Sequence, residues 1–63
     1  MNNIKQLRIK KELTQTQLAK KLRVGQSAVG MWETGKTQPK TSTLPKLAKA
    51  LDCTIDELLK EER

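Results

Sequence analysis

The sequence lacks histidine, tyrosine and phenylalanine entirely, and its 63 residues include one cysteine and one tryptophan. Without histidine, imidazole-based acid–base catalysis is excluded and a zinc site is close to excluded. A lone cysteine cannot form an internal disulfide. No apolar run approaches the roughly 18–20 residues of a membrane span, and no secretory signal pattern opens the chain. We therefore expect no metal, no cofactor and no membrane partner.

What is present suffices for one small domain. Hydrophobic residues make up 35% of the chain, and nine of them are leucine. A chain of this length usually forms a single domain. We therefore expect residues 1–63 to fold as one domain around an aliphatic core, in the cytoplasm.

Positive charge is concentrated in the first two thirds of the chain. Residues 1–40 hold nine basic and two acidic side chains, a net of +7, whereas residues 41–63 carry a net of −1. A basic part joined to a near-neutral part favours a polyanionic partner. A membrane surface or plain solvent would also suit such charge. The basic residues form no stripe beside an aromatic and leucine face, which argues against a membrane-surface helix.

Apolar residues recur at helical spacing in five short segments, and no strand-like alternation is present. The first follows Asn2 and Asn3, which can cap it. Thr14 and Gln17 form a capping box for the second, and Gly35 ends the third. The fourth begins near Pro45. Thr54 caps the fifth, whose apolar residues Ile55, Leu58 and Leu59 we expect to point inward. The sequence therefore predicts a compact all-α domain of five helices.

Residues 15–34 show the pattern of two helices that cross steeply over one core. Leu18 and Leu22 lie one turn apart on the first helix, and Val29 and Trp32 lie one turn apart on the second. About four residues, from Leu22 to Gly25, join the helices. An ordinary helical hairpin shares this spacing, but it does not predict the small residue at 19, the apolar Val24 in the turn, or Gln-Ser opening the second helix. The outer side of that helix is left polar or small.

These residues resemble the helix-turn-helix of the lambdoid phage repressor and Cro family, the XRE type. The resemblance covers about residues 3–59 and is carried by Leu18-Ala19, Leu22, Val24, Val29, Trp32-Glu33-Thr34-Gly35-Lys36, Pro39, Leu44, residues 46–51 and residues 55–59. Residues 25–30 are also similar to the recognition helix of the phage lambda repressor. The resemblance implies a five-helix lambda-repressor-like fold with its helix-turn-helix at about residues 15–34.

Three residues depart from the family pattern. Arg23 stands where a turn glycine is usual, and it costs about 1 kcal/mol if the backbone there keeps a positive φ. Gly25 replaces a side-chain cap. Asp52 replaces a common glycine after the fourth helix. None of the three removes the outer face of the third helix.

The outer face of the second helix in this pair supplies the candidate DNA-reading residues. The amide of Gln26 matches adenine N6 and N7, and Ser27 can donate or accept. Gly30 lets the helix backbone approach the groove closely, although glycine weakens a helix by about 1 kcal/mol relative to alanine. Met31 offers an apolar contact, such as one to a thymine methyl group. A solvated helix start is the alternative for Gln26 and Ser27.

Residues at both ends of the helix pair are candidates for phosphate contacts. The resemblance implies that Gln15, at the start of the second predicted helix, binds a phosphate and braces the amide of Gln26. Thr34, Lys36 and Lys40 flank the far end, with Thr37 and Gln38 as weaker candidates. The resemblance also suggests a partly buried structural ion pair between Arg8 and Glu33. Cys53 we expect in the core.

The expected function is sequence-specific binding of double-stranded DNA through the major groove, by a transcriptional regulator that acts as a repressor. Two copies would read half-sites about 34 Å apart, and by family analogy we expect a weak homodimer through residues 54–62. The alternative is an antitoxin-like or other protein-interaction module of the same fold. An enzyme is not expected, because no nucleophile–base pair or glycine-rich phosphate loop is present. The pattern allows a whole protein or an excised domain.

Overall fold

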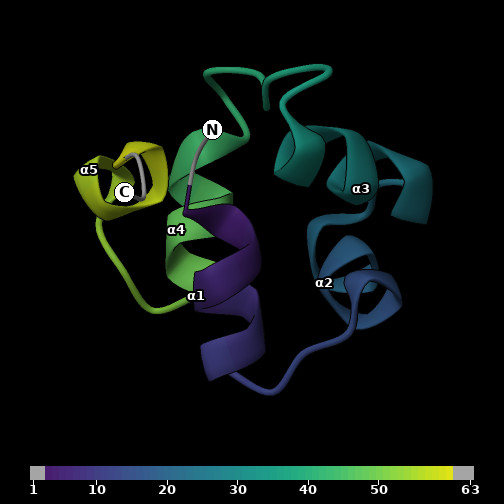
Figure 1. Cartoon of the computed structure of the whole chain (residues 1–63), viewed down its shortest axis with the longest axis horizontal. Coiled ribbons are helices and arrows are strands. Elements are labelled where there is room, and N and C mark those ends of the chain that lie inside the picture. Colours follow the sequence, from purple (N-terminus) through teal and green to yellow (C-terminus); the bar gives the residue numbers. More distant parts are fainter. Residues whose placement is uncertain (1–2, 61–63) are drawn as a thin grey trace.

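Each of the five amphipathic segments forms a short helix in the computed structural model, which describes residues 3–60 (Figure 1). The helices are α1 (Ile4–Lys10), α2 (Gln15–Leu22), α3 (Gln26–Thr34), α4 (Leu44–Ala50) and α5 (Ile55–Leu59). No strand occurs within residues 3–60. The all-α, five-helix prediction is confirmed. Because α2 includes Leu22, the α2–α3 connection is one residue shorter than the sequence suggested.

Three of the connections repeat one backbone geometry. In each of them, a residue with positive φ that is not glycine follows one or two positions after the helix: Glu12 (φ 57°), Arg23 (φ 58°) and Asp52 (φ 53°). The next residue's N–H then donates to the carbonyl five positions earlier, as in Leu13 to Arg8, Val24 to Ala19 and Cys53 to Ala48. This bond satisfies a carbonyl that the helix leaves unpaired. The half-buried apolar side chain of that next residue packs against the core.

The helix starts after these turns differ in their caps. The Thr14 and Thr54 hydroxyls accept from the backbone N–H of Gln17 and Glu57, and both capping boxes are complete. Gly25 precedes α3 without a side-chain cap. The expectation that Asn3 caps α1 is wrong in its mechanism, because Asn3 occupies the cap position but its side chain makes no capping bond. Asn2 lies outside the described residues.

The core lies where the helices meet, and it is almost entirely aliphatic. Its buried residues are Ile4, Leu18, Ala19, Val29, Trp32, Leu47, Ala48, Leu51 and Leu58. Burying a leucine or valine contributes about 1.5–3 kcal/mol relative to leaving it exposed. The inward orientation expected for Leu59 is wrong: this side chain is 46% exposed. Helix α5 is only five residues long and buries Leu58 alone, one position from Leu59.

The arrangement leaves the outer side of the α2–α3 pair uncovered. Helices α2 and α3 pack against each other, and α4 packs against α2 (Figure 1). Helices α1, α4 and α5 group on the other side of the molecule, where the Asn3 N–H donates to the Leu58 carbonyl across 3.0 Å. The 35–43 loop, anchored by buried Pro39, joins α3 to α4. The described helices therefore cover the inner face of α3 and leave its outer face open.

Candidate nucleic-acid interface

Helix α3 divides its residues between the core and solvent along its whole length. Val29 is fully buried and Trp32 is 6% exposed, so one face is held against α2 and α1. Gln26 and Ser27 are exposed, and so is Met31, at 38%. The sequence placed these three on the outer side, and the structure has them there. The first turn contains no acidic residue and no side-chain cap. The Ala28 N–H donates to the Gly25 carbonyl across 3.1 Å, whereas the N–H groups of Gln26 and Ser27 and the positive end of the helix dipole remain available to an outside acceptor.

A series of hydrogen-bonded polar side chains connects α1 to Glu33 in the last turn of α3 and, through Gln15 of α2, to Gln26 at the start of α3. Arg8 Nε donates to Glu33 Oε2 across 2.6 Å, and Arg8 Nη2 donates to Glu33 Oε1 across 3.3 Å. Arg8 Nη1 also donates to the Leu13 carbonyl at 2.7 Å. This ion pair joins α1 to α3, as the resemblance suggested. The Arg8 and Glu33 side chains are only 11% and 4% exposed. If one partner were removed, water could not adequately solvate the charge of the other.

The same carboxylate extends this series to the outer surface. Gln15 Nε2 donates to Glu33 Oε1 across 3.0 Å, and Gln26 Nε2 donates to Gln15 Oε1 across 3.2 Å. Gln15 therefore braces Gln26, as the resemblance implied. The bond from Gln15 to Glu33 was not anticipated from the sequence. It joins residues 18 positions apart, and the crossing of α2 over α3 brings them together.

Gly30 lies half-buried on α3 beneath the Gln15 amide. A Cβ atom built on Gly30 would lie 3.8 Å from Gln15 Nε2 and 3.9 Å from Gln15 Oε1. These are ordinary van der Waals contacts, so the protein's own packing does not require glycine here. The packing around position 30 therefore gives no internal reason for glycine, which weakens the helix relative to alanine.

The residues proposed for phosphate contacts lie at both ends of the α2–α3 pair. Gln15 is the first residue of α2 and is half-buried. Thr34 is the last residue of α3, and its hydroxyl donates to the Met31 carbonyl across 3.2 Å. Lys36, Thr37, Gln38 and Lys40 are exposed on the loop that follows. Lys36 is held close to α3, because its N–H donates to the Met31 carbonyl at 3.0 Å.

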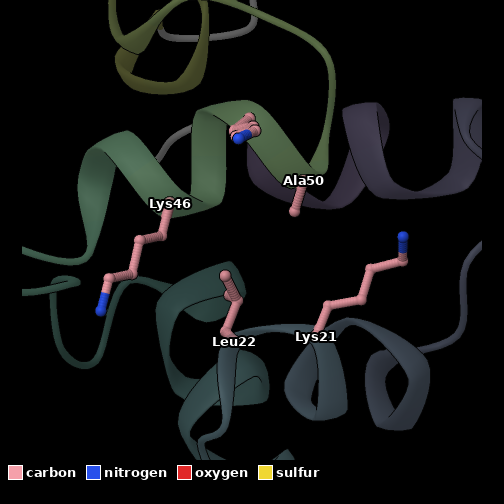
Figure 2. Close-up of a pocket in the computed structure, with 5 residues that line it drawn as sticks. Lys21, Leu22, Lys46 and Ala50 are labelled. Carbon is pink, nitrogen blue, oxygen red and sulfur yellow. The ribbon is translucent and has the colours of Figure 1, made fainter.

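A concave surface lies between α2 and α4 (Figure 2). This hollow has a volume of about 430 Å³ and is lined by Lys21, Leu22, Lys46, Lys49 and Ala50. In Figure 2, Leu22 and Ala50 face one another across the gap, whereas the side chains of Lys21 and Lys46 extend in opposite directions. Their ammonium groups do not converge on one point. No sequence motif marks this surface, because its lysines come from two separate helices.

Cys53 belongs to the packing of the domain. It is half-buried and packs against the core in the α4–α5 turn. Burial raises the pKa of its thiol, and the carboxylates of Glu57 and Asp52 raise it further, whereas Lys11 lowers it. A raised pKa disfavours the reactive thiolate. Within residues 3–60, no three or more Cys, Asp or Glu side chains gather where they could hold a metal ion. None of the described helices has the length and apolar character to cross a membrane.

Sequence comparisons find relatives among transcriptional regulators. The helix-turn-helix family model matches residues 4–58. The chain is 46% identical over 59 residues to the HTH-type transcriptional activator BcrR of Enterococcus faecalis, covering 94% of this chain and 29% of that protein. It is 38% identical over 60 residues to the uncharacterized HTH-type transcriptional regulator YqaE of Bacillus subtilis (strain 168), covering 95% of this chain and 52% of YqaE. The chain thus spans about half or less of the length of these relatives.

Solved structures match the whole arrangement of helices. The P22 c2 repressor, in complex with the synthetic operator 9T, superposes with a TM-score of 0.85 at 37% identity, covering 94% of this chain and 89% of that chain. A transcriptional regulator from Listeria innocua superposes with a TM-score of 0.83 at 30% identity, covering 97% of this chain and 57% of that chain. The first of these matches is a DNA-bound form of a chain only slightly longer than this one.

Proposed function

Because this chain belongs to the helix-turn-helix family, we propose that it binds double-stranded DNA sequence-specifically, with α3 in the major groove, and so regulates transcription. One observation carries the proposal: the outer face of α3 is uncovered, and its first residue, Gln26, is held in place by Gln15. A recognition helix presents its N-terminal residues to base edges. Its action is binding and not catalysis, in the cytoplasm, where such an operator would lie.

Four residues on the outer face of α3 have distinct roles in the proposed contact. Gln26 pairs with adenine N6 and N7, and Ser27 donates to or accepts from a neighbouring base. Met31, at 38% exposure, offers an apolar contact to a thymine methyl group. Gly30 lets the backbone of α3 approach the groove. This role would explain a glycine that the internal packing does not require.

Phosphate contacts at the two ends of the α2–α3 pair would hold α3 in register. Gln15 opens α2, where the helix dipole and the first N–H groups favour an anion. Thr34, Lys36 and Lys40 would bind phosphates at the opposite end of α3. Such contacts add affinity and salt dependence without reading sequence.

The sign of regulation depends on where the operator lies relative to a promoter. Repression by occlusion is the simplest outcome of binding by a small domain. The P22 c2 protein is named a repressor. The related BcrR is named an activator. The two names show that this domain type serves proteins of both kinds.

Pairing of two copies on DNA would double the recognised sequence. We place the contact at α5 and the residues after it, 54–62, of which 61 and 62 lie outside the described residues. Leu59, 46% exposed on α5, is the apolar side chain available there. We expect a weak dimer that forms on half-sites about 34 Å apart. Sedimentation of the free chain as a tight tetramer in dilute solution would contradict this expectation.

Selection of bound fragments from a random DNA pool is the first test of the proposed function. On the selected site, Gln26→Ala should lose about 1–3 kcal/mol of discrimination at one base pair. Lys36→Ala should weaken binding to all sequences alike and reduce the salt slope by about one. Equal effects of both variants on selected and random DNA would refute the assignment of α3. A mobility-shift experiment with mixed-sequence DNA tests the alternative function. An antitoxin-like module that binds only a protein partner would show no salt-sensitive retardation of the DNA.

A further inference from the structure

The series of hydrogen-bonded polar side chains has a direction that Glu33 imposes. A carboxylate has no hydrogen to donate, so every group that bonds to it must be a donor. Glu33 Oε1 lies 3.0 Å from the Gln15 side-chain amide. The nitrogen of that amide must therefore face Glu33. Since the nitrogen and oxygen of an amide lie on opposite branches, the Gln15 oxygen faces the other way, toward Gln26.

The direction then passes to Gln26, at the start of α3. Because Gln15 offers its oxygen, Gln26 must approach it with nitrogen, and the two atoms lie 3.2 Å apart. One N–H of Gln26 is thereby occupied. The side chain keeps one N–H and its carbonyl oxygen to offer outward. A donor beside an acceptor matches adenine N6 and N7, whereas guanine offers two acceptors, N7 and O6.

Glu33 itself is held so that it cannot release this direction. Its side chain is 4% exposed, and both of its oxygens accept hydrogen bonds from Arg8. Arg8 is fixed in turn by the Leu13 carbonyl. Arginine only donates and the Glu33 carboxylate only accepts, so the hydrogen bonds from Arg8 through Glu33 to Gln15 have one possible polarity.

We propose that Glu33 is a specificity-determining positioning residue, which acts through Gln15 to set the atoms that Gln26 presents to a base and so favours adenine over guanine. Glu33 touches no base, and its influence travels through two side-chain hydrogen bonds. The inference rests on the proposed function for its effect on DNA. The orientation of the two amides can be tested in the free protein.

Glu33→Gln is the decisive variant. It should reverse the donor–acceptor direction of the hydrogen bonds from position 33 through Gln15 to Gln26, while keeping the shape of the side chain at position 33. The shortest Arg8 bond, at 2.6 Å, reaches the Oε2 position and would hold the new carbonyl oxygen there. The amide nitrogen then takes the Oε1 position beside Gln15. Two NH₂ groups cannot bond to each other, so Gln15 must turn its oxygen inward and its nitrogen outward. The Gln26 oxygen would then accept from the Gln15 nitrogen, and both N–H groups of Gln26 would stay free.

The free protein gives the first readout. In the side-chain amide NMR spectrum, one N–H proton of Gln26 should be hydrogen-bonded and protected from exchange with water in the original chain. In the Glu33→Gln variant, both Gln26 protons should become solvent-like, provided that the fold is retained by backbone spectra. Unchanged Gln26 amide signals in the folded variant would overturn the proposal without any use of DNA.

Binding to the selected DNA gives the second readout, in which the base pair read by Gln26 is changed from A·T to G·C. The original chain should prefer A·T by roughly 5- to 150-fold, the span of one bidentate pair. Glu33→Gln should reduce that ratio at least about fivefold. Gln15→Met removes the hydrogen bonds to Glu33 and Gln26 without reversing their direction. It should reduce the preference for A·T over G·C as well, because the Gln26 amide can then rotate freely. If Glu33→Gln does not fold, the base preference of Gln15→Met still tests the proposal.

The outcomes separate this inference from the proposed function. An A·T preference that persists in Gln15→Met, or in folded Glu33→Gln, would overturn the role of Glu33 while leaving DNA binding intact. If Gln26→Ala has no effect on base preference, the proposed function of α3 fails, and the amide spectra still decide whether Glu33 sets the orientation of Gln26.

Discussion

The α2–α3 turn and the α4–α5 turn share one backbone geometry but open into helices of different character. In the first, Arg23 has φ 58° and the Val24 N–H donates to the Ala19 carbonyl across 3.0 Å. In the second, Asp52 has φ 53° and the Cys53 N–H donates to the Ala48 carbonyl across 2.9 Å. The turn itself is therefore a general device of this fold for joining two helices over a small core.

The helix starts after the two turns are where they diverge. Helix α5 begins with a complete Thr54–Glu57 capping box, and Asp56 and Glu57 place negative charge in its first turn. Helix α3 begins at Gly25 with neither a side-chain cap nor an acid. Asp56 and Glu57 repel a phosphate, whereas the open N–H groups of α3 attract one. The few residues after the turn therefore decide whether the helix on this scaffold becomes a candidate DNA-reading element.

The largest expected effect tests the buried ion pair that supports α3. Arg8→Ala leaves the Glu33 carboxylate buried without its partner and should cost about 3–5 kcal/mol of unfolding free energy. Replacing both residues with apolar ones, as Arg8→Met with Glu33→Leu, should cost less. Urea titration followed by circular dichroism measures both. The matched control is the exposed pair Lys11–Asp52, at 3.1 Å, where Lys11→Ala should cost about 0–1 kcal/mol. Equal losses of unfolding free energy for the two pairs would contradict a special structural role for the buried pair beneath α3.

The next effect tests the open start of α3 directly. Gly25→Asp adds a carboxylate at the cap position, which should repel DNA phosphates and lower affinity for the selected site on the order of tenfold. The same change should stabilise the fold by a few tenths of a kcal/mol, because aspartate caps better than glycine. Thr54→Asp is the matched control with an equal decrease in charge, and it should leave affinity for a duplex with a single half-site, on which no second copy pairs, nearly unchanged. Fluorescence anisotropy measures both; a parallel loss in the two variants would point to net charge alone.

A somewhat smaller effect tests the capped start of α5. Thr54→Ala removes the hydroxyl that accepts from the Glu57 N–H at 3.0 Å, and it should cost about 1 kcal/mol of unfolding free energy. Affinity for a duplex with a single half-site should not change, since Thr54 caps α5 and not α3, and pairing through residues 54–62 needs a second copy. Thermal unfolding and anisotropy on one sample check the pair of outcomes. A loss of affinity with the fold intact would bring α5 into the DNA contact.

The smallest effect tests the strain that both turns share. Arg23→Gly should stabilise the fold by about 1 kcal/mol, because glycine adopts positive φ without the steric penalty of a side chain. Asp52→Gly should stabilise it less, since aspartate tolerates this conformation better than arginine and the change also removes the partner of Lys11. Melting temperatures rank the two variants. A loss of stability in Arg23→Gly would mean that the Arg23 side chain contributes contacts that outweigh the strain.

Local chemistry explains which features could be predicted from the sequence. The Thr14–Gln17 box, the glycine end of α3 and the spacing of Val29 and Trp32 act within a few residues of the chain, so their pattern is legible without a structure. The Arg8–Glu33 pair was accessible only through the family resemblance, because its partners lie 25 positions apart.

The remaining features depend on how the helices cross. The bond from Gln15 to Glu33 and the lysine-lined hollow between α2 and α4 arise from contacts between separate helices. Leu59 is apolar, yet it follows Leu58 directly, and successive side chains of a helix point about 100° apart. The face of α5 that buries Leu58 therefore leaves Leu59 exposed. Asn3 has the right residue type for a cap, but its side chain makes no capping bond.

The most direct test of the central claim is a titration of the isotopically labelled protein with a duplex that carries a single half-site of its selected DNA, followed by NMR amide shifts. We predict the largest changes at Gln26, Ser27, Gly30 and Met31 and in the Gln15 side-chain amide, with small changes along α4 and α5. Largest changes along α5 or around the α2–α4 hollow, with α3 undisturbed, would contradict the assignment of α3 as the helix that reads DNA.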